Sequence, residues 1–396
     1  LHPRSTLPPS PSSPTKGGAP APAPGRGAMA KYAIVTTTIY VPKALDAYMQ
    51  NAVEYGHSDC LFVVSGDKKT PAEAQTFLAD AAKKHGVECI YQTVEDQIRW
   101  LERYPELAEE IPWNSIQRRN IAILTAYERG AEVIITIDDD NFFVPGQDFI
   151  GDHCAPILGG PHPHEQLTSN TRWLNVCSFL TDKNGVEYYP RGYPMDERFR
   201  KDPPFYKAGA SSRRVLVNAG LWLDDPDVDA ITRLCNDICA VQYTRNTSFS
   251  MANGTWCPFN SQNTAISRKL IPAYCLSPRV GRYDDIWASY VCLAIMDHFD
   301  DAVMFGFPLV KQERNPHNYF KDHMAERHGL EFTETFCRWL RAIPLKGATY
   351  LACLGEVMDG LEAASASSDA PQEFKDFVAG FVRSNRVWAT TLAKMG

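Results

Sequence analysis

An apolar run that ends in three consecutive aspartates constrains this chain more than any other segment. Residues 133–143 read VIITIDDDNFF, so Asp138, Asp139 and Asp140 stand at the exit of a strand-length run. A continuous run of Val and Ile is typical of a parallel strand covered on both faces. Open α/β sheets place their ligands at the carboxyl ends of such strands. The sequence therefore predicts an α/β fold with a site at this edge.

The three carboxylates indicate a cation, because they repel one another unless a hard divalent ion neutralises them. Oxygen ligands suit Mn²⁺ or Mg²⁺, which usually bridges carboxylates to substrate phosphates. Successive strand residues alternate sides, so Asp138 and Asp140 share a face if the strand persists. We expect Asp140 to bind the metal directly with Asp138 beside it, and Asp138, or Asp139 if the chain turns there, to hold the ribose. An acidic turn without metal is the alternative.

Composition narrows the class of protein. The chain has 396 residues and a formal net charge of −7, so it can hold one large or two modest domains and carries no basic stripe for nucleic acid. No apolar run is long enough to span a bilayer. The eleven cysteines are scattered, and free buried thiols in a cytoplasmic protein are expected rather than disulfides. Cys235 and Cys239 share a predicted helical face, but no second pair stands at zinc-ligand spacing.

Strands and helices alternate in the first part of the chain. Strands are predicted at 32–37, 60–64 and 87–91, and a helix at 43–55. A second helix is predicted to begin with Thr70 as N-cap and Pro71 at its first position. The stretch 115–129 reads as a helix that stops at Gly130. This alternation implies a mostly parallel sheet with helices on its faces.

No glycine-rich phosphate loop follows the first strand. A Gly-x-Gly-x-x-Gly fingerprint and a Walker loop are both absent from the sequence, so flavin and NAD are not expected. Phosphates must then be held by metal and side chains, which favours a nucleotide-sugar transferase architecture.

The later part of the chain is less regular. Residues 151–214 are predicted to be loop-rich, followed by strands at 215–223, 261–266 and 302–307 and a helix at 286–298. Helices are predicted from residue 316 to the end. We expect three parts: a disordered extension or tag at 1–28 with Met29 as the native start, a nucleotide-sugar domain at 29–320, and a helical region at 321–396 that packs on it.

Four motifs occur in one order along the chain. They are Ile137-Asp-Asp-Asp140, Pro190-Arg-Gly-Tyr-Pro194, Gly220-Leu-Trp-Leu223 and Gly281-Arg-Tyr-Asp-Asp-Ile-Trp-Ala288. In this order the sequence resembles the plant reversibly glycosylated polypeptides, which are UDP-arabinopyranose mutases. It looks closest to a bacterial branch of nucleoside-antibiotic biosynthesis that converts GDP-L-galactose between pyranose and furanose. The resemblance implies a glycosyltransferase type-A (GT-A) fold, manganese, and association into homo-oligomers.

The resemblance also implies roles for two arginines. Arg191 matches the position that becomes glycosylated in the family, and Arg198 matches a second arginine. A guanidinium remains protonated and is a poor nucleophile, so Arg191 either attacks the sugar or clamps the departing diphosphate. Pairing with surface carboxylates such as Asp196 or Glu197 is the structural alternative.

Further candidates lie at other predicted edges. Asp284 and Asp285 are read as a sugar-hydroxyl site or a general acid/base, or as caps of the next helix. Relatives carry a late histidine metal ligand before an Asn-Pro pair, for which His317 is the best substitute here, unless it is an ordinary loop histidine. Trp222 is read as a sugar-stacking or a core residue.

Nucleotide contacts are expected after the first strands and before the metal strand. The candidates are Thr36, Thr37, Thr38 and Asp67, of which Asp67 is equally well a turn residue. One of Arg118 and Arg119, with Arg119 preferred, is expected to reach ribose or phosphate and the other to be solvated.

The expected activity follows from these residues together with the resemblance. We expect a metal-dependent mutase that cleaves the anomeric C1–O bond of a GDP- or UDP-linked sugar and rejoins it after the ring recloses. The alternatives are a glycosyltransferase with an external acceptor and a non-catalytic subunit, because fold alone does not decide among them.

Overall fold

The computed structural model describes residues 31–202, 204–312 and 318–396, and its architecture centres on one mixed sheet. Four parallel strands form the first part in the order β3-β2-β1-β4. Their bounds are β1 Tyr32–Thr37, β2 Leu61–Ser65, β3 Glu88–Gln92 and β4 Val133–Ile137. Every residue of β4 is buried, as its Val and Ile content predicted.

The sheet continues beyond β4 through three further strands. β12 (Asn263–Ser267) is antiparallel to β4, and β9 (Val215–Asp224) is antiparallel to β12, so β9 runs parallel to β4. β13 (Ala302–Gln312) lies beside β9 and is parallel to it. The expected GT-A-like fold class, a mostly parallel sheet flanked by helices with a helical C-terminal region, is confirmed.

Short strands complete the sheet on the β13 side. β11 pairs with β13 and β6, β6 pairs with β8, β10 pairs with β7 and β9, and β5 pairs with the end of β13. Their bounds are β5 Asn141–Phe143, β6 His164–Ser169, β7 Leu180–Asp182, β8 Tyr206–Ser211, β10 Ala240–Tyr243 and β11 Phe249–Met251. The loop-rich prediction for residues 151–214 was wrong in part, because β6, β7, β8 and two helices lie there.

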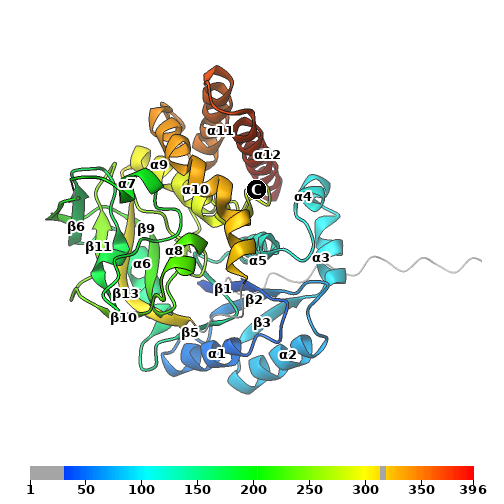
Figure 1. The fold of residues 1–396 in the computed structure, drawn as a ribbon. Coiled ribbons are helices and arrows are strands. Elements are labelled where there is room, and N and C mark those ends of the chain that lie inside the picture. Colours follow the sequence, from blue (N-terminus) through cyan, green and yellow to red (C-terminus); the bar gives the residue numbers. More distant parts are fainter. Residues whose placement is uncertain (1–30, 203, 313–317) are drawn as a thin grey trace, which may run out of the picture.

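Helices cover both faces of the first strands (Figure 1). α1 and α2 lie on one side of β1–β3, and α5 lies on the other, where it packs on β1 and β2. The helices before β9 are α1 Ala44–Glu54, α2 Glu73–His85, α3 Val94–Leu101, α4 Pro105–Glu110, α5 Arg119–Glu128, α6 Phe149–Leu158 and α7 Met195–Arg198.

The C-terminal helices pack around one tryptophan. Trp287 of α9 stacks on Phe336 of α10 with ring centroids 3.8 Å apart, and Phe381 of α12 meets it edge-on. Offset and edge-on aromatic pairs stabilise such a core beyond the area they bury. The bounds are α8 Ala230–Cys235, α9 Asp284–Phe299, α10 Tyr319–Ala342, α11 Tyr350–Ser367 and α12 Gln372–Met395.

Some local predictions were wrong for identifiable reasons. Thr70 does not cap α2, which begins at Glu73, because its hydroxyl instead donates to the Thr38 carbonyl at 2.6 Å. The predicted helix 115–129 opens as a 3-10 turn at Ile116–Arg118. α8 ends at Cys235, so Cys235 and Cys239 do not share a helical face.

All eleven cysteines lie within the described residues and are free thiols, as expected. The predicted extension at 1–28 lies outside the described residues. Among the described helices, none has the length and apolarity needed to cross a membrane.

Candidate active site at the carboxyl edge of the sheet

The carboxyl ends of β1, β4 and β9 and the start of β12 face one edge of the sheet. After β4 the chain turns and enters β5, whose Asn141 pairs with Gln312 of β13. Gln312 pairs in turn with Asp224 at the end of β9. This double pairing brings the aspartate triplet alongside the ends of β9 and β13.

The aspartate triplet lies in a turn rather than in an extended strand. β4 stops at Ile137, and the Asn141 N–H donates to the Asp138 carbonyl at 3.3 Å. The alternation argument that put Asp138 and Asp140 on one face therefore does not apply. Asp139 accepts a hydrogen bond from the hydroxyl of Thr38. Burial, with the neighbouring carboxylates of Asp138 and Asp140, raises the pKa of Asp139 to about 6.

Arg119 links the triplet to the start of β12. Its Nη2 donates to Asp138 Oδ1 at 2.5 Å, and its Nη1 donates to the carbonyl and hydroxyl of Ser261 at 2.8 Å each. Burial by itself lowers the pKa of Arg119, but the nearby Asp138 carboxylate outweighs it and raises that pKa. Arg118 was expected to be solvated if Arg119 is not; instead it is buried and stacks on Trp113 at 3.4 Å.

Arg191 is buried between two carboxylates. Nε donates to Asp227, Nη2 donates to Asp227 and Asp285, and Nη1 donates to Asp285 and to the Arg282 carbonyl. Its five N–H groups are thus all used. Burial opposes its charge, yet Asp227 and Asp285 raise the pKa of Arg191 well above its ordinary value. Its partners are buried carboxylates, not the surface Asp196 and Glu197.

Asp284 and Asp285 form the first turn of α9 without capping it by a side-chain hydrogen bond. Asp285 Oδ2 accepts from the backbone N–H and hydroxyl of Ser261 at 2.9 and 3.2 Å. Asp284 accepts from Gln117 Nε2 at 2.8 Å. Burial and the adjacent Asp285 carboxylate raise the pKa of Asp284 to about 7, which suits proton transfer near neutral pH.

These contacts form one continuous chain. It runs from Asp138 through Arg119, Ser261 and Asp285 to Arg191 and on to Asp227. Asn260 adds a hydrogen bond from its Nδ2 to Asp227 Oδ2 at 2.8 Å. Hydrogen-bonded networks of this kind hold a defined geometry, although Arg119 Nε is buried without a partner among the described residues. The structure thus joins two groups of candidates that lie far apart in sequence.

The candidates after β1 and β2 have mainly local partners. Thr37 donates to the Ser65 carbonyl at 2.9 Å, and the buried Thr36 donates to the Thr37 carbonyl at 3.3 Å. Asp67 accepts from the backbone N–H groups of Lys68 and Ser115 at 2.7 and 3.1 Å, which matches the turn alternative. Of this group, the Thr38 side chain contacts the triplet.

Arg198 and Trp222 lie apart from the network. Arg198 donates to Asp229 at 2.7 Å and to the Tyr193 carbonyl at 3.1 Å, and Asp229 is also the N-cap of α8. Trp222 is 4% exposed, which matches its core alternative. His317 lies outside the described residues.

Sequence reasoning missed four members of the site: Asp227, Asn260, Ser261 and Gln117. Asp227 is one of several aspartates after β9 (Asp224, Asp225, Asp227, Asp229), and that local density is the only sequence signal for it. The three neutral residues have no such signal, because their role depends on tertiary contacts.

Comparison with known sequences identifies the family. A profile of the reversibly glycosylated polypeptides matches residues 131–391. This range includes the aspartate triplet, Arg191, Arg198 and the Asp284–Asp285 pair. The chain belongs to this family. The family match thus covers all the elements from β4 onward that carry the network.

Curated relatives of this reversibly glycosylated polypeptide are plant proteins. A probable UDP-arabinopyranose mutase 1 of Solanum tuberosum is 28% identical over 254 residues, 60% of this chain and 62% of the relative. UDP-arabinopyranose mutase 2 of Arabidopsis thaliana is 31% identical over 214 residues, 51% of this chain and 52% of the relative. The chain thus spans only about half to three-fifths of the length of these relatives.

One solved structure shows a distant likeness. It is a mannosyltransferase from Pyrobaculum calidifontis in complex with GDP-mannose and Mn²⁺, with a TM-score of 0.40 and 13% sequence identity over 94% of this chain and 87% of that chain. At this TM-score the likeness says nothing about which ligands the present chain binds.

The triplet suits a divalent metal in its chemistry. Asp138 and Asp140 offer the carboxylate oxygen donors that Mn²⁺ and Mg²⁺ prefer. Among the described residues no group of three or more His, Cys, Asp or Glu side chains is placed to hold a metal ion. A substrate phosphate is the natural source of the remaining ligands.

Proposed function

We propose that this chain is a metal-dependent nucleotide-sugar mutase that interconverts pyranose and furanose forms by reversible cleavage of the anomeric C1–O bond. The observation that carries the proposal is the Arg119–Ser261–Asp285 connection between the triplet and Arg191. It supports the proposal because it links the aspartate triplet to Asp285, the sequence neighbour of the proposed acid/base Asp284. Family membership supports the same reaction class, because the named relatives are mutases.

Asp138 and Asp140 are the proposed metal-binding residues, with Arg119 orienting Asp138. The bound metal supplies Lewis-acid stabilisation of the charge that develops on the diphosphate as the bond to the sugar breaks. Asp139, held by Thr38, is the proposed contact to the ribose. His317 remains a proposed further ligand.

Asp284 is the proposed general acid/base. Ring opening delivers a proton to the ring oxygen as it leaves C1, and reclosure takes a proton from the hydroxyl that attacks C1, so a carboxyl with a pKa of about 7 can serve both steps. Its neighbour Asp285 is held in place by hydrogen bonds from Arg191 and Ser261.

Arg191 is the proposed positioning residue of this site. Its five N–H groups already donate to Asp227, Asp285 and Arg282, so none is left for a diphosphate. Attack on the sugar would first require loss of a proton that two carboxylates hold in place. We therefore assign Arg191 to fixing the two carboxylates, with Arg198 fixing Asp229 in the next turn.

The preferred substrate is proposed to be GDP-L-galactose, on the resemblance to the bacterial branch of antibiotic biosynthesis. The relatives above are named for UDP-arabinopyranose, so both sugars belong in the test. The protein is incubated with Mn²⁺ and a panel of GDP- and UDP-pyranoses without acceptor, and the products are examined by NMR. A furanose nucleotide-sugar is the expected product. Hydrolysis alone, or turnover only after an acceptor is added, would replace the mutase by a glycosyltransferase.

A further inference from the structure

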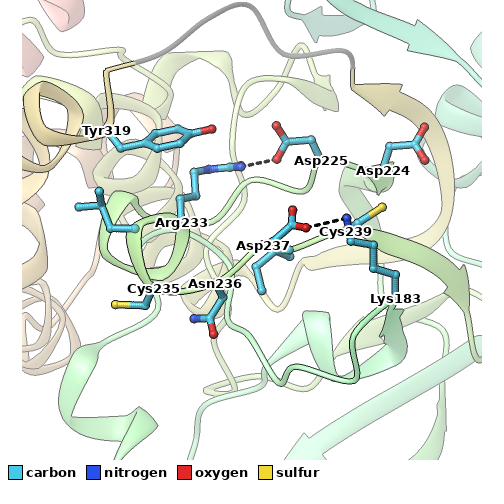
Figure 2. Close-up of a pocket in the computed structure, with 11 residues that line it drawn as sticks. Lys183, Asp224, Asp225, Arg233, Cys235, Asn236, Asp237, Cys239 and Tyr319 are labelled. Carbon is cyan, nitrogen blue, oxygen red and sulfur yellow. Dashed lines mark hydrogen bonds and ion pairs between the residues drawn. The ribbon is translucent and has the colours of Figure 1, made fainter.

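A cavity of about 600 Å³ opens beside the end of β9, and its lining is polar. Figure 2 shows Asp224 and Asp225 on one side, Tyr319 with Arg233 opposite, and Asp237 with Lys183 below. Its size lies in the range of small-ligand sites. Of the residues that line it, the sequence analysis considered only Cys235 and Cys239, as a metal-binding pair.

Asp224 is the last residue of β9 and lines the cavity. It is exposed, and its carboxylate makes no hydrogen bond or ion pair with the residues that the structure describes. Its backbone has φ of +66°, a conformation that is uncommon outside glycine and is concentrated at functional sites. β9 therefore ends in a residue of uncommon backbone conformation whose carboxylate borders the cavity and has no hydrogen-bond partner among the described residues.

The charges of the cavity largely cancel. Arg233 is paired with Asp225, and Lys183 is paired with Asp237 at 2.9 Å. Three carboxylates face two cations in the lining, which disfavours a phosphate or another anion. Carboxylate acceptors, the Asn236 amide and the Tyr319 ring instead match the hydroxyls and the apolar face of a neutral sugar.

The cavity is connected to the active site by the backbone. In the segment 224–229, Asp225 lines the cavity and Asp227 accepts a hydrogen bond from Arg191. Asp224 pairs with Gln312 and Gln312 with Asn141, so Asp224 stands two strand spacings, roughly 10 Å, from the residue that follows the triplet. A nucleotide-sugar whose diphosphate lies at the triplet can reach this far with its sugar.

We infer that this cavity receives the sugar ring of the nucleotide-sugar, with Asp224 accepting hydrogen bonds from sugar hydroxyls and Tyr319 contacting the ring. The inference rests on the proposed function, because it takes the diphosphate to lie at the triplet. It adds a sugar-specificity site at the end of β9.

The test compares two affinities by titration calorimetry in Mn²⁺ for wild type, Asp224→Asn and Tyr319→Ala. The probes are GDP and GDP-L-galactose, and UDP and UDP-arabinopyranose. Asn tolerates the positive φ, so Asp224→Asn changes the charge and not the backbone. Asp80→Asn, an exposed carboxylate on α2, is the matched control.

The expected result is selective. In Asp224→Asn the ratio of nucleotide-sugar to nucleoside-diphosphate affinity falls roughly tenfold, the size of one charged hydrogen bond, while the affinity for GDP or UDP is unchanged. Asp80→Asn keeps the wild-type ratio. Tyr319→Ala should lower the same ratio, and an unchanged ratio in either Asp224→Asn or Tyr319→Ala would overturn the inference. Failure of the proposed function would instead show in the wild type, as absence of binding to every probe, and would remove the inference with it.

Discussion

The guanidinium of Arg191 meets the carboxylate of Asp285 fork to fork, Nη1 to Oδ1 and Nη2 to Oδ2, each at 3.1 Å. The opposite side of the same guanidinium is held by Asp227 through Nε and Nη2. This geometry uses the planar fork of arginine, which lysine cannot reproduce. Arg191 therefore pairs with two buried carboxylates at once, and its removal would leave both without their cation.

Replacement of Arg191 by alanine is expected to destabilise the protein. Two buried carboxylates would lose their partner, which costs about 3–5 kcal/mol. Chemical denaturation measures the change. Arg103→Ala is the matched control, because Arg103 pairs with Glu128 at the surface and should cost under about 1 kcal/mol. Equal stability of Arg191→Ala and wild type would show that the two carboxylates do not depend on Arg191.

Removal of Asp140 is expected to abolish the contribution of metal to nucleotide binding. Asp140→Ala should lower the affinity for a nucleoside diphosphate in Mn²⁺ at least about tenfold, because one carboxylate ligand of a hard cation is lost. Affinity measured in chelator should be the same for variant and wild type. A metal-independent affinity in the wild type would contradict the assignment of the triplet.

Replacement of Ser261 by alanine is expected to weaken the connection between the triplet and Asp285. Its hydroxyl contacts both Arg119 and Asp285, and hydrogen bonds to charged groups contribute about 1.5–3 kcal/mol each. Turnover should fall at least about tenfold while the fold is retained. Ser289→Ala is the control, since that buried hydroxyl donates only to the Ile286 carbonyl at 2.7 Å. If the two variants have the same kcat, the network does not serve the reaction.

The pH dependence of stability should report Asp284. Its folded pKa of about 7 lies above the value in an unfolded chain, so the folded state holds a proton that the unfolded state loses. Its contribution favours folding at low pH and is lost as pH rises from about 4 to 7, with little change above that. Asp284→Asn should flatten this decline in denaturation curves. The same variant should remove an inflection near pH 7 from the kcat profile; a profile that keeps it would exclude Asp284 as the acid/base.

The sheet and the triplet could be predicted because their signals are local. The Val133–Ile137 run fixes a buried strand, and the alternation of strands and helices fixes the parallel sheet. The region between residues 151 and 214 could not be predicted in the same way. β6 and β8 pair with each other, but neither contains a strand-like apolar run, and most residues of β8 are exposed.

Only some residues of the candidate site could be predicted from the sequence, for a similar reason. Aspartates and arginines in motifs could be recognised from the sequence. Ser261 and Gln117 could not, because their role depends on hydrogen bonds to partners more than twenty residues away. The turn after Ile137 also overrode strand alternation, because the Asn141 N–H closes it on the Asp138 carbonyl. Period-two reasoning holds only as long as the strand does.

The most direct test of the account is NMR observation of products from a nucleotide-pyranose incubated with the protein, with and without Mn²⁺. The account predicts a furanose form of the same nucleotide-sugar in Mn²⁺ and none after chelation, with Asp140→Ala behaving like the chelated wild type. Undiminished ring interconversion by chelator-treated protein would contradict it.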